Sequence, residues 1–560
     1  MKNSTHIPFT STRSIDVRHS TFNQVGRDQF NNTIIHIIQT SEVEDILASL
    51  KPAERGGYYV PPCMNGTREK FLGEIDQWLG DVDAPNVLWI NGSPGSGKST
   101  IASSLVSKLT ERGILGSCFF FKRGDLILGD PAAVWRTVAY DLARFDPVFT
   151  TNLVEVLKGK AVDPGRPDIA LHFNYLIQKP LTKSYSDSRF HNIPVIVIDA
   201  LDECDPQPAQ RKQFLDTLTQ WSQLSKTFKL IVTSRDEYFI PKQFRAICKQ
   251  MSIPTGDGVS ADADEDIRLF FNQRFAELVS SPSFELDRIP SIEVLRARAE
   301  GLFIWASTVM RFIEQGLPEE RLELVLNRDP GAGDHLTELY QQVLHLSFPK
   351  PDGAILEAFK RVLAAIVFAK GSIFYEDLPQ LISESHSSVK FILGKLSSVV
   401  SIGEDNYVRI SHSSFSEFLC DQRQCPEEFL LNPARDSQML ATACFRLMKD
   451  ELRFNICHLE TSHLLNTQVD DLPERIMANI STALLYSCRF WAAHLRDSMI
   501  ESNDLGRLLE EAKDFFHHRL LFWLEVMSLT NNIAVANVAL LTSAHSITVR
   551  IFQLLFPFSY

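Results

Sequence analysis

The chain has 560 residues, which is too long for one hydrophobic core and predicts several domains. Its 44% hydrophobic and 22% charged residues are typical of a globular protein, and a formal net charge of −13 argues against a general nucleic-acid surface. The sequence has no signal-peptide pattern, no apolar run long enough for a membrane span, and nine scattered cysteines without a CxxC pair. We therefore expect a cytoplasmic protein with reduced thiols, no membrane span and no nucleic-acid partner.

Residues 1–52 form a polar N-terminal segment, in which Phe22-Asn23 recurs as Phe30-Asn31. The low charge, the Asn and Gln content and the closing β-branched run of residues 20–38 are typical of segments that stack as cross-β, so this stretch is a candidate amyloid-like assembly motif. A flexible tail or an edge hairpin is the alternative. A lead-in helix is expected next, within residues 53–80.

Strands and helices alternate across residues 81–260. Apolar strands are expected at 86–90, 114–121, 193–199 and 228–235, and helices are expected between them. Asp130-Pro131 and Asp146-Pro147 each predict a helix start, with a side-chain cap before a proline. This alternation predicts an α/β P-loop NTPase domain with a parallel, doubly wound sheet.

The remaining chain is predicted to be mostly helical. Amphipathic helices fill a helical domain at 261–370. Residues 371–422 contain a helix at 374–382, a helix at 387–400, two short strands around the turn 403–406 and a helix at 413–420, which is a winged-helix-like pattern. Residues 423–560 form an all-α C-terminal region without a repeat period of roughly 20 to 50 residues.

The stretch NGSPGSGKST, residues 91–100, fits the pattern GxxxxGK[ST] between a strand and a helix. The glycines let successive backbone N–H groups point at a phosphate, and the helix N-terminus adds positive potential. Lys98 is expected to reach the β- and γ-phosphates of ATP, or the β-phosphate of ADP, and Ser99 to bind Mg²⁺. The candidate nucleotide-binding residues here are Gly92, Gly95, Ser96, Gly97, Lys98, Ser99 and Thr100.

The stretch VIVIDALDECD, residues 195–205, runs from a buried strand into a cluster of acids. Asp199, at the strand end, is placed to hold the magnesium ion. Asp202 and Glu203 are the candidate catalytic acids, because either could orient or deprotonate an attacking water. Taken without the P-loop, the cluster would be read as surface acids. Arg235, at the end of a further strand, could contact the γ-phosphate, or could serve as a cap or an ion-pair partner.

These motifs together resemble the NACHT class of signal-transduction ATPases with numerous domains (STAND), and more closely the nephrocystin-like NACHT proteins of mushroom-forming fungi. The stretches that carry the resemblance lie between about residues 58 and 500: CMNGTREKFLGEIDQWL, GSPGSGKST, SCFFFKRGD, VIVIDALDE, LIVTSRDE, GLFIWAST and ISHSSFSEFL. The resemblance implies a switch in which ADP holds the winged helix closed, ATP releases it for homo-oligomerisation, and slow hydrolysis resets it. His412 matches the family's winged-helix histidine, whereas taken alone it would be a capping or core residue.

Two other functions stay open at this point. A turnover P-loop enzyme, such as a small-molecule kinase or a repair ATPase, would need a second basic pocket, and only Lys122 and Arg123 suggest one. A nucleotide-bound scaffold without hydrolysis would not need the acids at 199–203. Many family members carry WD or tetratricopeptide repeats as sensors. Here either the helical C-terminal region detects the signal, or an unknown protein effector or sensor partner beside the nucleotide does, or the chain is an incomplete product.

Overall fold

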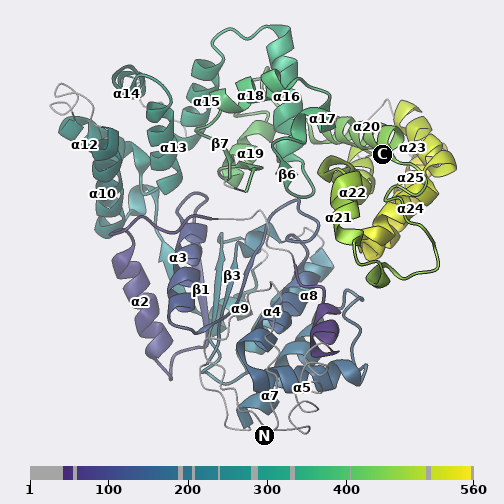
Figure 1. The fold of residues 1–560 in the computed structure, drawn as a ribbon. Coiled ribbons are helices and arrows are strands. Elements are labelled where there is room, and N and C mark those ends of the chain that lie inside the picture. The colour runs from purple at the N-terminus through teal and green to yellow at the C-terminus, as the bar shows by residue number, and fades with distance from the viewer. Residues whose placement is uncertain are drawn as a thin grey trace, which may run out of the picture.

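The computed structural model describes residues 42–53, 60–186, 193–204, 208–237, 240–278, 288–327, 335–403, 405–499 and 506–555. Figure 1 shows an α/β part in its lower half, with a second group of helices above it. The candidate assembly motif at residues 20–38 and the acid Asp205 lie outside the described residues. The cross-β prediction therefore stays a prediction.

The α/β part contains a parallel sheet with helices on both faces. A helix at residues 42–48 comes first. The elements that follow are α2 (Glu69–Gly80), β1 (Val87–Gly92), α3 (Lys98–Glu111), β2 (Leu115–Phe120), α4 (Pro131–Phe145), α5 (Pro147–Lys158), α6 (Ile169–His172), the π-helical η1 (Phe173–Gln178), α7 (Lys179–Ser186), β3 (Val195–Asp199), the 3-10 turn η2 (Leu201–Glu203), α8 (Pro208–Trp221), β4 (Leu230–Ser234), α9 (Lys242–Ile247) and β5 (Lys249–Ile253).

The five strands pair in the order β2-β3-β4-β1-β5, and every pairing is parallel. The predicted doubly wound sheet is thus confirmed. Strand β4 lies between β1 and β3, so the carboxyl ends of these three strands meet at one edge. The edge strand β5 was not predicted, because Lys249, Gln250 and Ser252 interrupt its apolar pattern. Only Met251 and Ile253 of β5 are buried.

Alternate residues of each central strand pack into two different cores. In β1, Leu88 and Ile90 pack with α2 and α3, whereas Val87 and Trp89 pack with α4 and its neighbours. Figure 1 shows α2 and α3 on one side of the sheet and α4 and α8 on the other. Both faces of the strands are therefore covered, which explains why the strands read as continuous apolar runs.

The predicted helix starts are confirmed. Asp130 accepts a hydrogen bond from the backbone N–H of Ala132, and Asp146 accepts one from that of Phe149. The chain just after the N-terminal segment also belongs to this part, because the backbone N–H of Ala53 donates to Thr137 Oγ1 at 2.9 Å. The lead-in helix predicted within 53–80 is α2, which occupies only residues 69–80.

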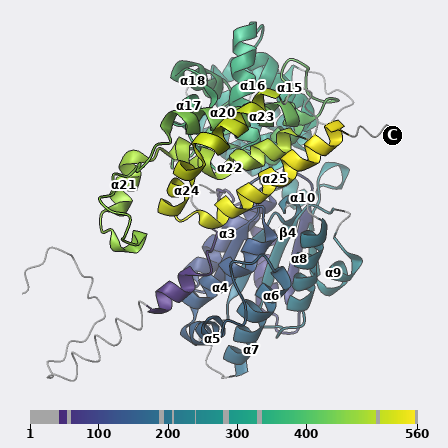
Figure 2. The same cartoon turned by 90° about the vertical axis from the view of Figure 1, so that its right-hand side faces the viewer.

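The helices above the sheet form one body with a continuous hydrophobic core. Its first elements are the 3-10 turn η3 (Gly256–Gly258), α10 (Ala261–Leu278), α12 (Arg288–Ala299), α13 (Phe303–Glu314), α14 (Pro318–Leu326), α15 (His335–Ser347) and α16 (Gly353–Val367). The C-terminal elements are α20 (Pro433–Glu451), the 3-10 turn η4 (Asn466–Gln468), α21 (Leu472–Asn479), α22 (Thr482–Ser498), α23 (Gly506–His518), α24 (Leu520–Leu529) and α25 (Ile533–Leu555). Figure 2 shows α20 and α22–α25 gathered on the side of this body.

Residues 373–420 form what we name the small-sheet unit. It contains β6 (Ile373–Phe374), α17 (Leu378–Ile382), α18 (His386–Lys395), β7 (Val400–Ile402), β8 (Tyr407–Ile410) and α19 (Ser413–Cys420). The strands form an antiparallel sheet in the order β6-β8-β7. The unit shares the core of the helical body through Val408 and Phe415.

Two details of the small-sheet unit differ from the sequence prediction. Phe374 does not begin a helix, because Ile373 and Phe374 pair with β8 as strand β6. The following helix begins only at Leu378, where Pro379 occupies the first turn. Helix α18 ends at Lys395 and does not reach Val400, which lies in β7. The apolar pattern of this region therefore combines helix and strand periods.

Among the described residues, none of the helices is both long and apolar enough to cross a bilayer. All nine cysteines lie in the described part and are free thiols.

Candidate nucleotide site

The loop between β1 and α3 curls back on itself at two glycines. Gly95 has φ 78° and Gly97 has φ 94°, both in the left-handed region that favours glycine. Helix α3 then begins at Lys98, so its first backbone N–H groups lie at the carboxyl edge of the sheet. Helix N-termini of this kind bind phosphate, because their N–H groups have no partner within the helix.

Lys98 is buried under this loop. Its Nζ donates to the carbonyl oxygens of Gly92 at 2.8 Å and Ser93 at 2.9 Å. Burial lowers the pKa of Lys98, while the nearby carboxylates of Asp202 and Asp199 act in the opposite direction. The ammonium therefore lies between the loop and the acids at the end of β3.

Asp199, at the end of β3, has no solvent exposure. Thr233 Oγ1 donates a hydrogen bond to its Oδ1. Burial raises the pKa of Asp199, and the hydroxyls of Thr233 and Ser99 and the charge of Lys98 oppose the rise. Its other oxygen, Oδ2, makes no hydrogen bond of ordinary length within the described part of the chain. A buried carboxylate oxygen near the Ser99 hydroxyl fits a hard cation such as Mg²⁺.

A hydrogen bond between the ends of β3 and β4 holds the turn that carries the acid Asp202. Ala200 adopts φ 57°, and its backbone N–H donates to Thr233 Oγ1 at 3.0 Å. The chain then turns through η2. Asp202 Oδ1 accepts a hydrogen bond from the backbone N–H of Arg235 at 2.9 Å, and Asp202 Oδ2 forms an ion pair with Arg235 Nε at 3.1 Å. Asp202 and Arg235 are thereby locked together across the ends of two strands.

Glu203 points toward the loop that follows β2. Its Oε2 accepts a hydrogen bond from the backbone N–H of Arg123 at 3.1 Å. Burial raises the pKa of Glu203, and the Arg123 hydrogen bond opposes the rise. A carboxylate with a raised pKa is a better proton acceptor than an ordinary one at the same position.

Helix α19 of the small-sheet unit covers this edge of the sheet. Glu417 on α19 accepts hydrogen bonds from Arg235 at 2.8 and 3.2 Å, and from Arg123 at 3.0 Å. Ser413, at the start of the same helix, accepts a further one from Arg235 Nη2 at 3.3 Å. Arg235 therefore joins the α/β part to the small-sheet unit through its side chain.

His412 caps α19 and also faces the nucleotide edge. Its Nδ1 accepts from the backbone N–H of Ser414 at 3.1 Å and forms a 2.7 Å hydrogen bond with Ser414 Oγ. Burial lowers the pKa of His412 to about 3, with a further contribution from the charges of Lys98 and Arg235. The imidazole is thus neutral at physiological pH and lies within the field of the P-loop lysine.

Sequence reasoning assigned no role to Arg68, which lies beside the P-loop. Its Nη2 donates to the carbonyl oxygen of Ser96 at 2.9 Å, and its guanidinium lies 4.9 Å from the centre of the Phe303 ring. Its backbone N–H donates to Asp266 Oδ2 at 3.1 Å. The only signal was its position in the stretch TREKF, which belongs to the family resemblance.

Helix α13 also packs against the P-loop. The backbone N–H of Ile304 donates to the carbonyl oxygen of Gly95 at 3.1 Å. A Cβ at Gly95 would lie 2.0 Å from Ile304 Cγ2, so only glycine fits there. Arg68 and α13 therefore both hold the P-loop.

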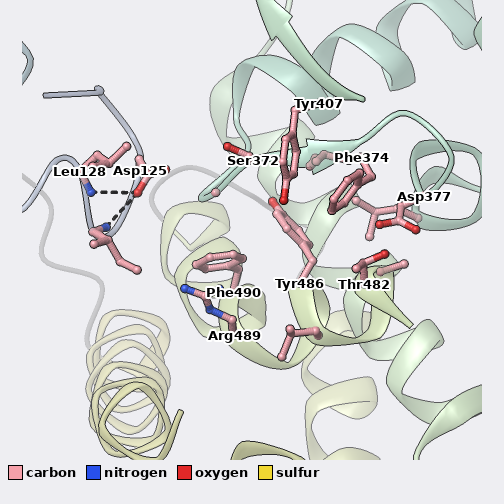
Figure 3. Close-up of a pocket in the computed structure, with 16 residues that line it drawn as sticks. Asp125, Leu128, Ser372, Phe374, Asp377, Tyr407, Thr482, Tyr486, Arg489 and Phe490 are labelled. Carbon is pink, nitrogen blue, oxygen red and sulfur yellow. Dashed lines mark hydrogen bonds between the residues drawn. The ribbon is translucent and has the colours of Figure 1, made fainter. Parts of the chain in front are cut away.

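A separate cavity of about 140 Å³ lies where the β2–α4 loop, the small sheet and α22 meet. Figure 3 shows Asp125 and Leu128 of the loop on one side, Phe374 and Tyr407 of the small sheet on another, and Tyr486 of α22 between them. None of the predicted site residues lines it. The P-loop edge has the phosphate chemistry, and we take that edge, not this cavity, as the candidate site.

One protein family and one curated protein are similar to this chain in sequence. Residues 66–235 match the model of the family "Nephrocystin 3, N-terminal". The vegetative incompatibility protein HET-E-1 of Podospora anserina is 26% identical over 490 residues, which cover 81% of this chain and 34% of that protein. The chain thus spans about a third of the length of this curated relative.

Solved structures give more distant likenesses. A STAND protein with a tetratricopeptide repeat sensor from Pyrococcus horikoshii has a TM-score of 0.40 and 13% identity, with 87% of this chain and 65% of that chain covered. The Orc1 protein of Aeropyrum pernix, solved in complex with DNA, has a TM-score of 0.29 and 16% identity, with 65% of this chain and 94% of that chain covered.

Proposed function

Since this chain is a NACHT-like protein of the STAND class, we propose that it is an ATP/ADP-dependent switch that oligomerises on activation and resets by slow hydrolysis. One observation carries the proposal. At one edge of the sheet, Arg235 forms an ion pair with Asp202, and both groups act electrostatically on Lys98. The same Arg235 is bound by Glu417 on α19 of the small-sheet unit. A change of ligand at this edge would therefore act on a contact between two parts of the molecule.

The P-loop would hold the phosphates of the nucleotide. Backbone N–H groups from Gly95 to Thr100 and the Lys98 ammonium would compensate the phosphate charge. Ser99 and Asp199 would hold the magnesium ion, which supplies further charge neutralisation when it is bound. Within the described part of the chain, Oδ2 of Asp199 has no hydrogen-bond partner of ordinary length, which supports this assignment.

Glu203 is the stronger candidate for orienting the attacking water. Both carboxylate oxygens of Asp202 contact Arg235, one through a hydrogen bond from the backbone N–H and one through an ion pair with Nε, whereas Glu203 accepts from the backbone N–H of Arg123 and has a raised pKa. We therefore assign Asp202 to positioning Arg235, and Glu203 to accepting the proton of the water.

The nucleotide content of the gently purified protein tests the proposal. We expect ADP to be retained, and to exchange slowly for added Mg-ATP with growth of the particle in sedimentation. An empty site with rapid steady turnover would indicate a turnover enzyme, and retained ATP that is never hydrolysed would indicate a scaffold. No binding of either nucleotide in calorimetry would refute the proposal.

A pair of variants tests the role of Glu203. Glu203→Gln should keep ATP binding but slow hydrolysis by roughly 100- to 10,000-fold, because the neutral amide cannot accept the proton. Glu111→Gln, an exposed change at the end of α3, is the matched control and should hydrolyse at the wild-type rate. Wild-type turnover in Glu203→Gln would transfer the role to Asp202.

A further inference from the structure

The cavity of about 140 Å³ takes its walls from three parts of the chain that lie far apart in the sequence. The β2–α4 loop contributes Leu128, the small sheet contributes Phe374, and α22 contributes Tyr486 (Figure 3). The loop is tied to the helical body beside the cavity, because the backbone N–H of Leu126 donates to the carbonyl oxygen of Lys370 at 3.2 Å. An apolar cavity of about 150 Å³ accepts a molecule of the size of benzene. The volume here therefore suits one six-membered ring with a small substituent.

Aromatic rings from two elements line this cavity. Phe374 and Tyr407, which are paired across β6 and β8, have ring centres 4.0 Å apart. Tyr486 and Phe490 of α22 have ring centres 4.9 Å apart in an edge-to-face arrangement. The hydroxyl of Tyr486 is already hydrogen-bonded to His494 Nε2 at 2.9 Å, so Tyr486 presents its ring to the cavity. Because aromatic rings attract one another in offset and edge-to-face arrangements, these walls favour an aromatic guest.

Arg489 of α22 brings a cation to the same cavity. Its Cζ lies 5.1 Å from the centre of the Phe490 ring. Over the described residues, its Nε is buried without a hydrogen-bond partner and its side chain forms no ion pair. A guanidinium binds a carboxylate through two parallel hydrogen bonds. The polar group that this end of the cavity would bind is therefore an anion, and a carboxylate fits it best.

Two acids also line the cavity, and both already have partners. Asp125 Oδ1 accepts hydrogen bonds from two backbone N–H groups of its own loop, at 2.9 and 3.0 Å. Burial raises the pKa of Asp377, and a hydrogen bond from the Thr482 side chain opposes the rise. Figure 3 shows Asp377 and Thr482 on the opposite side of Tyr486 from Arg489. These acids would repel a second negative charge, so a ligand with one carboxylate, placed at Arg489, suits the cavity.

We propose that this cavity binds a small monocyclic aromatic carboxylate, with its ring against Phe374, Tyr407 and Phe490 and its carboxylate on Arg489. Ligand pockets in proteins combine apolar walls with a few polar groups that fix the orientation of the ligand, which is the composition found here. The site is separate from the P-loop edge, and the inference does not depend on the proposed nucleotide function. Because the β2–α4 loop and the helical body both line the cavity, one bound molecule would contact both parts.

Benzoate is the probe that tests the site, with binding followed by ligand-observed NMR and calorimetry. The wild type should bind it with a Kd of roughly 0.1 to 1 mM, which is ordinary for a ligand of this size. Benzamide keeps the ring but has no charge, and cyclohexanecarboxylate keeps the charge but has no aromatic ring. Each of these two molecules should bind about 10-fold more weakly than benzoate.

Variants of the full chain locate the bound molecule. Arg489→Gln should weaken benzoate binding about 10-fold, to the affinity of benzamide, because the carboxylate loses its charged partner. Arg453→Gln is the matched control, since Arg453 is exposed and does not line the cavity, and it should bind benzoate as the wild type does. Phe374→Leu keeps an apolar side chain but loses a ring, and should weaken binding roughly 3- to 10-fold.

Three outcomes would overturn the inference. The first is that the wild type binds no benzoate at about ten times the expected Kd. The second is that benzoate and benzamide bind equally well, and the third is that Arg489→Gln and Arg453→Gln lose the same affinity. If Arg489→Gln does not fold, Phe374→Leu decides, with an unchanged affinity for benzoate contradicting the inference. All measurements are made without nucleotide, so none of these outcomes bears on the proposed function.

Discussion

Two contacts between the helical body and the nucleotide edge, one at α13 and one at α19, have opposite chemistry. At α13, Ile304 is buried against Gly95 and donates a backbone hydrogen bond to it. At α19, Glu417 meets Arg235 and Arg123 through charges that are partly exposed. Both helices belong to the same hydrophobic core, in which Tyr340 of α15 packs against Phe415 of α19 with ring centres 5.0 Å apart.

If the two parts separate as the proposed switch requires, the α19 contact is expected to break before the α13 contact. Burial of an aliphatic side chain such as Ile304 contributes roughly 1.5 to 3 kcal/mol and is insensitive to salt. Exposed ion pairs contribute about 0 to 1 kcal/mol and are screened by salt. A rotation of the helical body about the α13 contact would separate Glu417 from Arg235 without opening a core. We therefore call the contact of Ile304 with Gly95 the pivot, because it would stay in place, and the contact of Glu417 with Arg235 and Arg123 the latch, because it would open.

The largest expected effect comes from replacing Lys98, the cation of the P-loop. Lys98→Ala should lower the affinity for ATP and ADP by at least about 100-fold, since two charge-assisted hydrogen bonds to phosphate are worth roughly 3 kcal/mol or more. The α13 contact should survive, so the circular dichroism spectrum should stay that of the wild type. Calorimetry measures the affinity, and an unchanged value would remove the P-loop assignment.

The pivot itself is tested at its glycine. Gly95→Ala should lower the free energy of unfolding by about 1 to 3 kcal/mol more than Gly97→Ala does, because only its Cβ meets Ile304. Gly97 is the matched control: it also has a positive φ, and nothing lies within 4 Å of its added Cβ. Ile304→Ala in the Gly95→Ala background should recover part of the loss. Equal losses in the two glycine variants, measured by denaturant unfolding without nucleotide, would show that α13 does not press on the loop.

Arg68 also supports the P-loop, and its replacement should have a smaller effect. Arg68→Lys keeps the charge but loses the planar group that lies over Phe303 while donating to Ser96, so we expect a loss of roughly 1 to 2 kcal/mol in unfolding free energy. Arg112→Lys is the control, since Arg112 pairs with Asp76 at the surface. Equal effects of the two changes on the denaturation midpoint would argue against a supporting role for Arg68.

Local sequence rules predict the strand ends and the P-loop of the candidate site. The strand ends that carry Asp199 and Arg235 follow from apolar runs, and the curl of the P-loop follows from glycines at a fixed spacing. Such features depend on residues close together in the chain, so their geometry can be read directly. The parallel sheet was predictable for the same reason.

The contacts that helices make with this edge depend instead on how elements far apart in the sequence pack together. Glu417 is 182 residues from Arg235, and Arg68 is 28 residues from Ser96. No local pattern distinguishes Glu417 from any other exposed helical acid before α19 is placed on the edge. Helix α17 shows the same limit at a smaller scale, because Phe374 becomes a strand residue only through its pairing with Tyr407 on β8.

The smallest expected effect concerns the latch and its dependence on pH. In the closed arrangement burial lowers the pKa of His412 to about 3, whereas an imidazole freed from this edge would titrate near 6.5. The open form therefore binds the extra proton, and the closed form loses stability as the pH falls below about 6.5. At pH 5.5 the shift toward the open form should be about 10-fold, or roughly 1.4 kcal/mol, relative to pH 7.5.

A neutral variant isolates this contribution from those of the acids nearby. His412→Gln cannot take up the proton but keeps an acceptor for the backbone N–H of Ser414, whereas Asp199 and Glu203 titrate in both proteins. The ADP release rate of the wild type should rise about 10-fold between pH 7.5 and 5.5, while the rise in His412→Gln should be only what the acids cause. Equal pH profiles in the two proteins would mean that His412 stays buried when ADP leaves, and the latch would then consist of the Glu417 ion pairs alone.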